Sequence, residues 1–340
     1  MAGSGQARIG IVVIGRNEGE RLRRCLRSLP VAAQRIYVDS ESTDGSATWA
    51  RSQGVEVIEL TAPPKHTAAR GRNAGLRHLL AEHSGLAFVQ FVDGDCEVHP
   101  DWLDTAAAAL DADDRLGAVF GRRRERFPER SIYNALCDDE WNVPVGAALT
   151  CGGDVMCRIE AVAAIQGYDE SMIAGEDPDM STRLRAAGWG IERIDAEMTL
   201  HDAAILRFGQ WWKRTRRAGH AFAELAHRHP DAAPGWPGKC RSIMIWGMAI
   251  PAATLLALAG GLIVHPVGLA LAAGLLLLWP LNVARLLRAR RDLPARVARA
   301  NAVLLMLGKI PEALGLAEYH VGRLMGRQAQ LIEYKGPDAG

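Results

Sequence analysis

The chain has 340 residues, and its 40 Lys and Arg residues nearly cancel its 39 Asp and Glu residues, leaving a formal net charge of +1. This balance gives no support to nucleic acid as a partner, because nucleic-acid-binding domains usually carry a marked basic excess. The six cysteines form no C-x-x-C pair, which argues against a structural zinc site and a disulfide framework and favours reduced thiols. We therefore expect a cytoplasmic setting, and the absence of a long apolar stretch at the N-terminus agrees with it.

The first 92 residues alternate the patterns of strands and helices. Ile9 to Ile14 is a continuous apolar run of the kind found in central parallel strands, and Asn17 can cap the helix that follows. Further strands are expected at Arg35–Val38, Val55–Leu60 and Leu86–Val92, with helices at Asp44–Gln53 and Ala68–Glu82. This order predicts an α/β fold with a doubly wound, mostly parallel sheet.

Three aspartates follow strands of this predicted sheet. Asp39 ends the second strand, while Asp93 and Asp95 follow the fourth, so all three should emerge along the carboxyl edge where open α/β folds bind ligands. Asp-Gly is also a common turn pair, so Asp93-Gly94-Asp95 alone is weak support for a site. The chain has no G-x-G-x-x-G turn and no G-x-x-x-x-G-K-[ST] loop, so a phosphate ligand would need another counter-charge, which a cation on Asp93 and Asp95 would supply.

Five segments together resemble the family 2 glycosyltransferases of GT-A fold in order and spacing: Val12–Glu18, Val38–Ser46, Arg72–Gly75, Asp93–Asp95 and Gly175–Asp177. The resemblance covers residues 8 to about 220. It implies that Asp39 recognises the nucleotide, that Arg72 and Asn73 lie beside the donor, and that Asp93 and Asp95 bind Mg²⁺ or Mn²⁺ and the donor diphosphate. Within that pair, Asp95 is expected to be the direct ligand.

The same resemblance places the general base in the later acidic pair, at Asp177 or its neighbour Glu176. A cation stabilises the charge on a leaving diphosphate, and a carboxylate can take the proton of an attacking hydroxyl, so direct displacement with one base predicts inversion. Each acid has a simpler alternative, since Glu176 and Asp177 could serve only a helix N-terminus. Arg72 and Asn73 could likewise only cap or pair within their own helix.

Candidates of lower weight lie between these motifs and after them. In relatives a histidine after the base motif completes the metal site, which suggests His201, although a lone histidine is often a core residue. The run from Gln210 contains Arg214 as a candidate donor ligand and Trp211 and Trp212 as candidate acceptor contacts, and its order departs from the Q-x-x-R-W signature of processive enzymes. Asp154, after two glycines, is a further acceptor candidate.

The basic run Arg122-Arg123-Arg124-Glu125-Arg126 follows a predicted strand at Ala118–Gly121. It could attract an anionic acceptor, but we interpret it as solvated surface.

After Arg241 no charged residue occurs until Arg285. Ile243–Val264 and Val267–Ala284 are long enough to cross a bilayer core, and His265-Pro266 separates them. Basic residues flank both ends, so the positive-inside rule predicts a helical hairpin, at about residues 243–287, with both ends in the cytoplasm. A buried or re-entrant hairpin is the alternative.

A third apolar segment, Ala302–Leu316, is interrupted by Lys309, Pro311 and Glu312, and we expect interfacial helices at about residues 300–332. Loop-forming residues before 238 predict a boundary between a catalytic domain, 1–238, and a membrane region, 239–340.

Together these features predict an inverting, metal-dependent, non-processive glycosyltransferase at the cytoplasmic face of the inner membrane. Its donor would be a nucleotide-diphosphate sugar, with UDP favoured, and its acceptor a lipid-linked or cell-envelope glycan held near membrane lipids. Two alternatives remain: a sugar-phosphate nucleotidyltransferase, which would release pyrophosphate, and a catalytically inactive membrane scaffold. The sequence does not predict the sugar or the oligomeric state.

Overall fold

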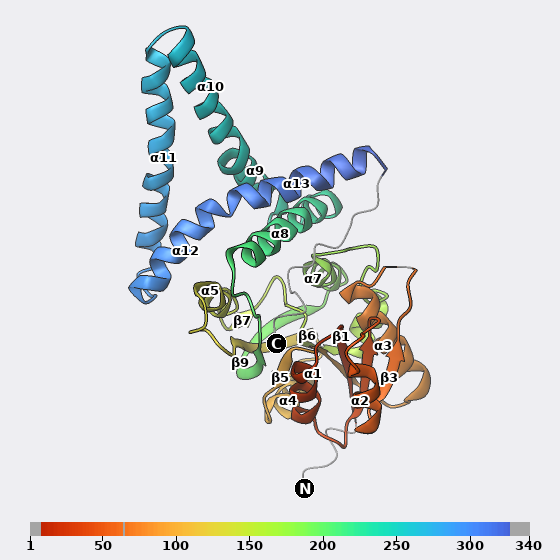
Figure 1. Ribbon diagram of the computed structural model, residues 1–340. Helices are drawn as coiled ribbons and strands as arrows, with labels where there is room; N and C mark the ends of the chain where they lie inside the picture. The colour runs from red at the N-terminus through yellow and green to blue at the C-terminus, as the bar shows by residue number, and fades with distance from the viewer. Residues whose placement is uncertain (1–7, 64, 327–340) are drawn as a thin grey trace. The chain divides into compact units, whose positions relative to one another are not determined.

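The computed structural model describes residues 8–63 and 65–326, which form two compact units (Figure 1). The first unit contains residues 8–128 and 137–204, and the second contains residues 129–136 and 205–326. The division falls earlier in the chain than the expected boundary near residue 238, because the helix that follows residue 205 packs with the C-terminal helices. The last part of the predicted interfacial stretch, residues 327–332, lies outside the described residues.

The N-terminal half of the first unit contains the predicted parallel sheet. Its strands are β1 (Ile9–Gly15), β2 (Gln34–Asp39), β3 (Glu56–Glu59) and β4 (Phe88–Asp93), and its helices are α1 (Glu20–Ser28), α2 (Ser46–Ser52) and α3 (Ala68–Glu82). The strand order β3-β2-β1-β4 is parallel throughout, so β1, β2 and β4 all end at one edge.

The later strands make the sheet mixed. They are β5 (Cys96–Val98), β6 (Leu116–Glu125), β7 (Gly146–Ala147), β8 (Val155–Arg158) and β9 (Gly190–His201), with helices α4 (Trp102–Ala112), α5 (Ile132–Glu140), α6 (Ile159–Ala164) and α7 (Glu176–Ala186). β8 lies antiparallel between β4 and β6, whereas β6 and β9 are parallel. The α/β class is confirmed, and the antiparallel direction of β8 is a feature that its short sequence, Val155-Met156-Cys157-Arg158, does not predict.

Close packing of α3 on β1 sets the position of the site. A Cβ atom on Gly75 would lie 2.3 Å from Cγ1 of Val12, so the helix approaches the strand more closely than any larger residue allows. Val12 and its neighbours on β1 are fully buried, as is most of β4. The approach brings the buried first half of α3, with Arg72, over the carboxyl ends of these strands.

The second unit is helical. Its elements are α8 (Phe208–Arg228), α9 (Trp236–Met244), the π-helical turn η2 (Ile245–Ala249), α10 (Ile250–Ile263), α11 (Val267–Ala289), α12 (Ala295–Leu307) and α13 (Lys309–Leu324). α13 lies along α8, and a Cβ on Gly219 would be 2.0 Å from the carbonyl oxygen of Glu312. α10 and α11 form the hairpin in Figure 1, where Gly261 and Gly268 bring the two backbones together.

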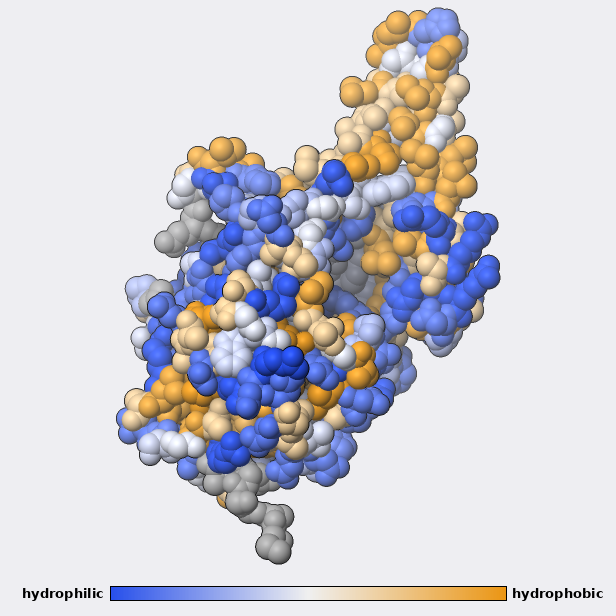
Figure 2. Space-filling model, turned by 180° about the vertical axis from the view of Figure 1, so that it is seen from behind, coloured by the Kyte–Doolittle hydropathy of each residue, from blue (hydrophilic) through white to orange (hydrophobic). Residues whose placement is uncertain are grey.

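Three helical segments of the second unit are long and apolar enough to cross a membrane: Trp236–Ile263, Val267–Ala289 and Ala295–Leu324, with mean hydropathy of 1.9, 2.0 and 1.3. Only 11% and 6% of the most apolar windows of the first two are buried, and Figure 2 shows hydrophobic side chains over most of the α10–α11 hairpin. The window of the third is 44% buried, because α13 packs on α8. The third segment begins a few residues before the expected start near residue 300, and nearly half of its most apolar window is covered by protein.

Candidate functional site

The turn between β4 and β5 holds two acids at the sheet edge. Asp93 ends β4, and the backbone N–H of Gly94 donates to the carbonyl oxygen of Ile14 at 2.8 Å. A Cβ on Gly94 would lie 3.0 Å from that same oxygen, so a larger residue would push the turn away from β1. The glycine thereby fixes both flanking aspartates relative to the end of β1.

A buried arginine joins the two acidic motifs. Arg72 Nη2 donates to Asp93 Oδ1 at 2.8 Å, while Nη1 donates to Glu176 Oε1 at 3.1 Å and to Asp177 Oδ1 at 3.0 Å. The Arg72 side chain is only 3% exposed. The structure thus brings α3, the end of β4 and the start of α7 into one cluster of predicted residues.

Asn73 faces a different part of the chain. Its Nδ2 donates to the carbonyl oxygen of Tyr168 at 2.8 Å, and its Oδ1 accepts from the Tyr168 N–H at 2.8 Å. Asn73 therefore orders the loop before α7, and the alternative that it pairs only within its own helix is wrong.

A second arginine, Arg123, binds the other side of Asp93. Its Nη2 donates to Asp93 Oδ2 at 3.0 Å, and its Nε donates to Asp154 Oδ2 at 3.0 Å. Asp154 also accepts from the backbone N–H of Asp93 at 2.9 Å and from Thr199 Oγ1 at 2.8 Å. The acceptor candidate Asp154 therefore has both carboxylate oxygens committed to holding Asp93 and Arg123 in place.

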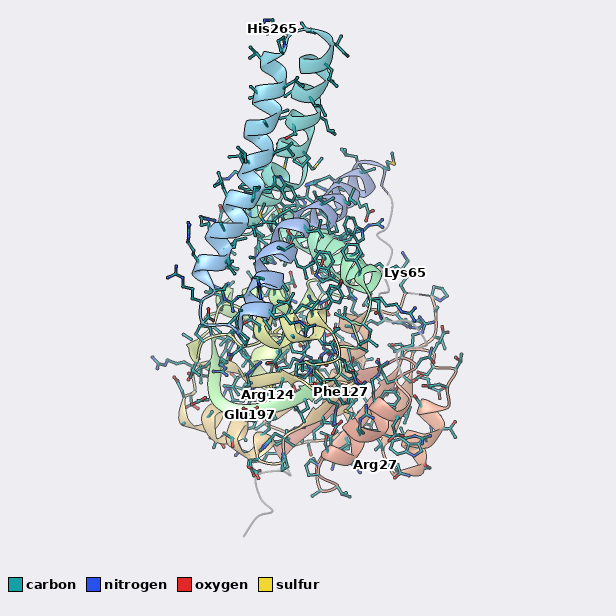
Figure 3. The ribbon with its side chains drawn as sticks, turned by 60° about the vertical axis from the view of Figure 1, so that its left-hand side comes forward. Arg27, Lys65, Arg124, Phe127, Glu197 and His265 are labelled. Atoms are coloured by element: carbon teal, nitrogen blue, oxygen red, sulfur yellow. The ribbon has the colours of Figure 1, made fainter. Side chains whose placement is uncertain are left out.

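The interpretation of the basic run as solvated surface is wrong for Arg122 and Arg123. β6 continues to Glu125, and a register shift between Arg122 and Arg123 lets both side chains turn inward, where Arg122 pairs with Asp138 at 2.9 Å. Arg124 does behave as expected, since it forms an exposed ion pair with Glu197 at 2.6 Å (Figure 3). The charged residues 122–126 predicted the end of the strand at Gly121, whereas β6 continues through the arginines to Glu125.

Asp95 and His201 meet at the start of β5. β5 pairs antiparallel with β9, and Cys96 lies opposite His201 in this pairing. His201 Nε2 lies 3.3 Å from Asp95 Oδ1. Possible ligand atoms of Asp95, Cys96 and His201 all lie within 4.8 Å of one another. A carboxylate and an imidazole suit Mn²⁺ and are acceptable to Mg²⁺, so these residues fit the expected cation. Asp93 is held by two guanidinium groups, and this favours Asp95 and His201 as the direct ligands.

The site holds two carboxyl groups in opposite electrostatic states. Burial would raise the pKa of Asp93, but Arg72 and Arg123 hold it below its usual value. Burial raises the pKa of Asp177 to about 7, with the Glu176 and Asp93 charges adding to the effect and Arg72 opposing it. Asp177, whose carboxylate is basic near neutral pH, is suited to accept a proton. Asp93, whose carboxylate stays ionised, is suited to stabilise nearby positive charge.

Asp39 lies at the same sheet edge, where it pairs in register with Gly15 of β1. Its Oδ1 accepts from Tyr37 Oη at 2.7 Å and its Oδ2 accepts from the Ser42 N–H at 2.8 Å. These contacts fix the carboxylate while leaving further lone pairs on both oxygens.

Arg214, Trp211 and Trp212 belong to α8 of the second unit, and their proposed roles remain predictions. Trp211 is buried and stacks with Tyr133 at 6.1 Å between ring centroids. This packing gives Trp211 a structural role within that unit.

Sequence reasoning missed Arg123, Thr199 and Trp141. The Arg123 guanidinium lies 5.3 Å from the centre of the Trp141 ring, which in turn meets the His201 ring edge-to-face at 4.7 Å. Thr199 could have been found, because residues two apart on a strand share a face and His201 follows it by two. Nothing in the sequence around Trp141 marks it as part of the site.

Residues 10–146 match the family model described as "Glycosyl transferase family 2". Over 270 residues the chain is 28% identical to the "Pre-mycofactocin glycosyltransferase" of Mycobacterium tuberculosis, covering 75% of this chain and 53% of the relative. The chain thus spans about half the length of that relative. It is 29% identical over 266 residues to the "Succinoglycan biosynthesis protein ExoA" of Rhizobium meliloti, covering 75% of this chain and 77% of the relative.

Among solved structures, the chain resembles the mannosyltransferase PcManGT from Pyrobaculum calidifontis, determined in complex with GDP-Man and Mn²⁺. The TM-score is 0.53 at 20% identity, and the match covers 94% of this chain and 87% of the other. This likeness supports the GT-A fold.

Proposed function

Because residues 10–146 match the glycosyl transferase family 2 model, we propose that this protein transfers a single sugar from a nucleotide-diphosphate sugar to an acceptor hydroxyl. The observation that carries the proposal is Arg72, whose guanidinium contacts Asp93 at 2.8 Å and Asp177 at 3.0 Å. The buried Arg72 guanidinium thus contacts both the carboxylate expected on the donor side and the carboxylate expected to act as base. That arrangement suits a reaction in which a nucleoside diphosphate leaves and a hydroxyl attacks.

On the donor side, Asp95 and His201 would hold Mg²⁺ or Mn²⁺, which as a Lewis acid stabilises the negative charge of the departing nucleoside diphosphate. Arg72 and Arg123 would hold the Asp93 carboxylate in place on this side of the site. Asp39, fixed by Tyr37 and Ser42, would accept hydrogen bonds from the nucleotide base.

On the acceptor side, Asp177 would take the proton of the attacking hydroxyl. As that oxygen forms its bond to the anomeric carbon, the bond from this carbon to the diphosphate breaks, and the nucleoside diphosphate carries away the electron pair. A single displacement of this kind inverts the anomeric configuration. Arg72 orients Asp177, and burial keeps the carboxylate basic enough to accept the proton.

We further propose a UDP-sugar as donor, a lipid-linked or cell-envelope glycan as acceptor, and a location at the cytoplasmic face of a membrane. Three candidate membrane helices support the membrane association, and the name of ExoA, a succinoglycan biosynthesis protein, agrees with a glycan acceptor. Arginines at positions 285, 288, 290 and 291 support placing the end of α11 in the cytoplasm. The departure from Q-x-x-R-W supports transfer of one sugar at a time.

Thermal unfolding of the full chain in detergent tests the donor assignment. With a panel of nucleotide sugars and Mn²⁺, the cognate donor at a hundredfold excess over its dissociation constant stabilises the fold by about 2.7 kcal/mol. We expect this stabilisation to vanish with chelator and in Asp95→Asn. Stabilisation by nucleoside triphosphates and sugar phosphates would instead favour a nucleotidyltransferase, whose product is a nucleotide sugar, and no stabilisation by any of these compounds would favour a scaffold.

A further inference from the structure

The second unit contains a groove of about 630 Å³ between α8, α9, η2, α10 and α13. Its lining includes Ala226, Arg241, Met244, Ile245, Met248 and His320. The surface of the groove is chiefly apolar, and its volume lies in the range of sites that hold small molecules.

One wall of the groove continues into a candidate membrane span. Met244, Ile245 and Met248 are 50%, 43% and 45% exposed, and they belong to the continuous segment Trp236–Ile263 that is long and apolar enough to cross a bilayer. Large apolar side chains exposed on one continuous surface indicate a surface that is covered by lipid or a partner. If this segment crosses a bilayer, a hydrocarbon chain could enter the groove along the same apolar surface.

The polar residues that line the groove are basic. They are His227, Arg241 and His320, and the Arg323 guanidinium lies 3.4 Å from His227 Nδ1. Arg241 is exposed and forms no ion pair among residues 8–63 and 65–326. An exposed guanidinium in the lining of an apolar groove is suited to bind a phosphate group through two parallel hydrogen bonds.

Acidic residues of the neighbouring helices do not compensate Arg241. Glu224 pairs with Arg228 at 2.8 Å, Glu312 pairs with Lys309 at 2.6 Å, and Glu318 pairs with Arg216. Each carboxylate thus has its own cation, and the groove retains an excess of positive charge. The positive charge of Arg241 without an acidic partner in the groove favours an anionic ligand.

We propose that this groove binds one molecule of an anionic phospholipid from the bilayer. Its acyl chain lies against Met244, Ile245 and Met248, and its phosphate binds Arg241, with His227 and His320 nearby. The site lies within the second unit, so lipid binding does not depend on sugar transfer and remains if the proposed function is wrong.

Native mass spectrometry of the full chain in detergent tests the proposal with phosphatidylglycerol and with diacylglycerol, which has the chains but no phosphate. We expect one tightly bound phosphatidylglycerol, at least tenfold weaker binding in Arg241→Gln, and weak binding of diacylglycerol. Ala249→Trp, which fills the groove, should also remove the bound lipid. Matched controls are Arg288→Gln and Ala273→Trp, two exposed positions on α11 outside the groove, which should bind as the parent chain does.

Thermal unfolding of each variant separates loss of the site from loss of the fold. The proposal is overturned if folded Arg241→Gln binds phosphatidylglycerol as tightly as Arg288→Gln, or if diacylglycerol binds equally well. It is also overturned if the groove is covered by a second copy of the chain, in which case Ala249→Trp would dissociate a dimer without changing lipid binding.

Discussion

Replacing the proposed base should abolish activity and at the same time stabilise the protein. Burial raises the pKa of Asp177 to about 7 from an ordinary value of 3.8, and the Glu176 and Asp93 charges add to this effect. The folded state therefore binds the proton of Asp177 more tightly than the unfolded chain does. Asp177→Asn keeps the size of the side chain and removes the unfavourable charge.

The size of the effect follows from the two pKa values. Each pKa unit corresponds to about 1.36 kcal/mol, so an ionised Asp177 costs the folded state about 4 kcal/mol at high pH. Since the side chain is 21% exposed, we expect about 2–4 kcal/mol. The cost is absent below pH 4, where the carboxyl is protonated in both states, and complete above pH 7. The loss of the base should lower the transfer rate by a factor of about 10²–10⁴.

Thermal or denaturant unfolding of the full chain, in chelator at pH 5 and pH 8, measures the stability difference. Asp177→Asn should be more stable than the parent chain, and the gain should be larger at pH 8. Asp179→Asn is the matched control, because Asp179 is buried in the same helical turn but pairs with Arg183 at 2.8 Å, so its replacement should destabilise. A destabilised Asp177→Asn at pH 8, or one with unchanged turnover, would refute the reasoning.

Further predictions concern the residues around this base. In the parent chain, kcat/KM for transfer should fall tenfold per pH unit below about 7 as Asp177 is protonated, and a profile that is flat down to pH 5 would exclude it as the base. His201→Ala should weaken Mn²⁺ binding at least tenfold by calorimetry, and unchanged affinity would remove it from the metal site. Gly153→Ala should lower the affinity for the donor, because the new Cβ would lie 2.1 Å from Arg72 Nη2 and displace that side chain. Unchanged affinity in a donor titration would show that the position of Arg72 does not matter for donor binding. Arg123→Met should destabilise by about 3 kcal/mol or more, since it leaves buried Asp154 without its cation, whereas Arg124→Met should change unfolding little.

The sequence predicted the parts of the fold that depend on local pattern. The observed α3 has the predicted bounds, Ala68–Glu82, and β2 and β4 end at Asp39 and Asp93, where these acids were expected. Alternation of strands and helices in this region leaves few possible topologies. The antiparallel direction of β8 was not predictable, because a strand of three apolar residues and Arg158 is compatible with either direction.

The sequence predicted the site residues that belong to contiguous motifs. It did not predict the contacts between residues that lie far apart in the chain. Asp93 and Asp177 were identified from their motifs, but their common contact with Arg72 depends on α3 lying close against β1. The charged neighbours of Arg123 predict a surface position, whereas the structure places it inward at a register shift in β6. The packing of distant elements decided which charges became part of the site.

The central claim is that the acid cluster transfers sugar with release of a nucleoside diphosphate. Phosphorus NMR of the full chain with its cognate donor and acceptor, in the presence of Mn²⁺ at a concentration that preserves the signals or of Mg²⁺, identifies the phosphorus product directly. We predict a nucleoside diphosphate that accumulates with the parent chain and not with Asp177→Asn. Accumulation of pyrophosphate, or an equal yield from Asp177→Asn, would contradict the account.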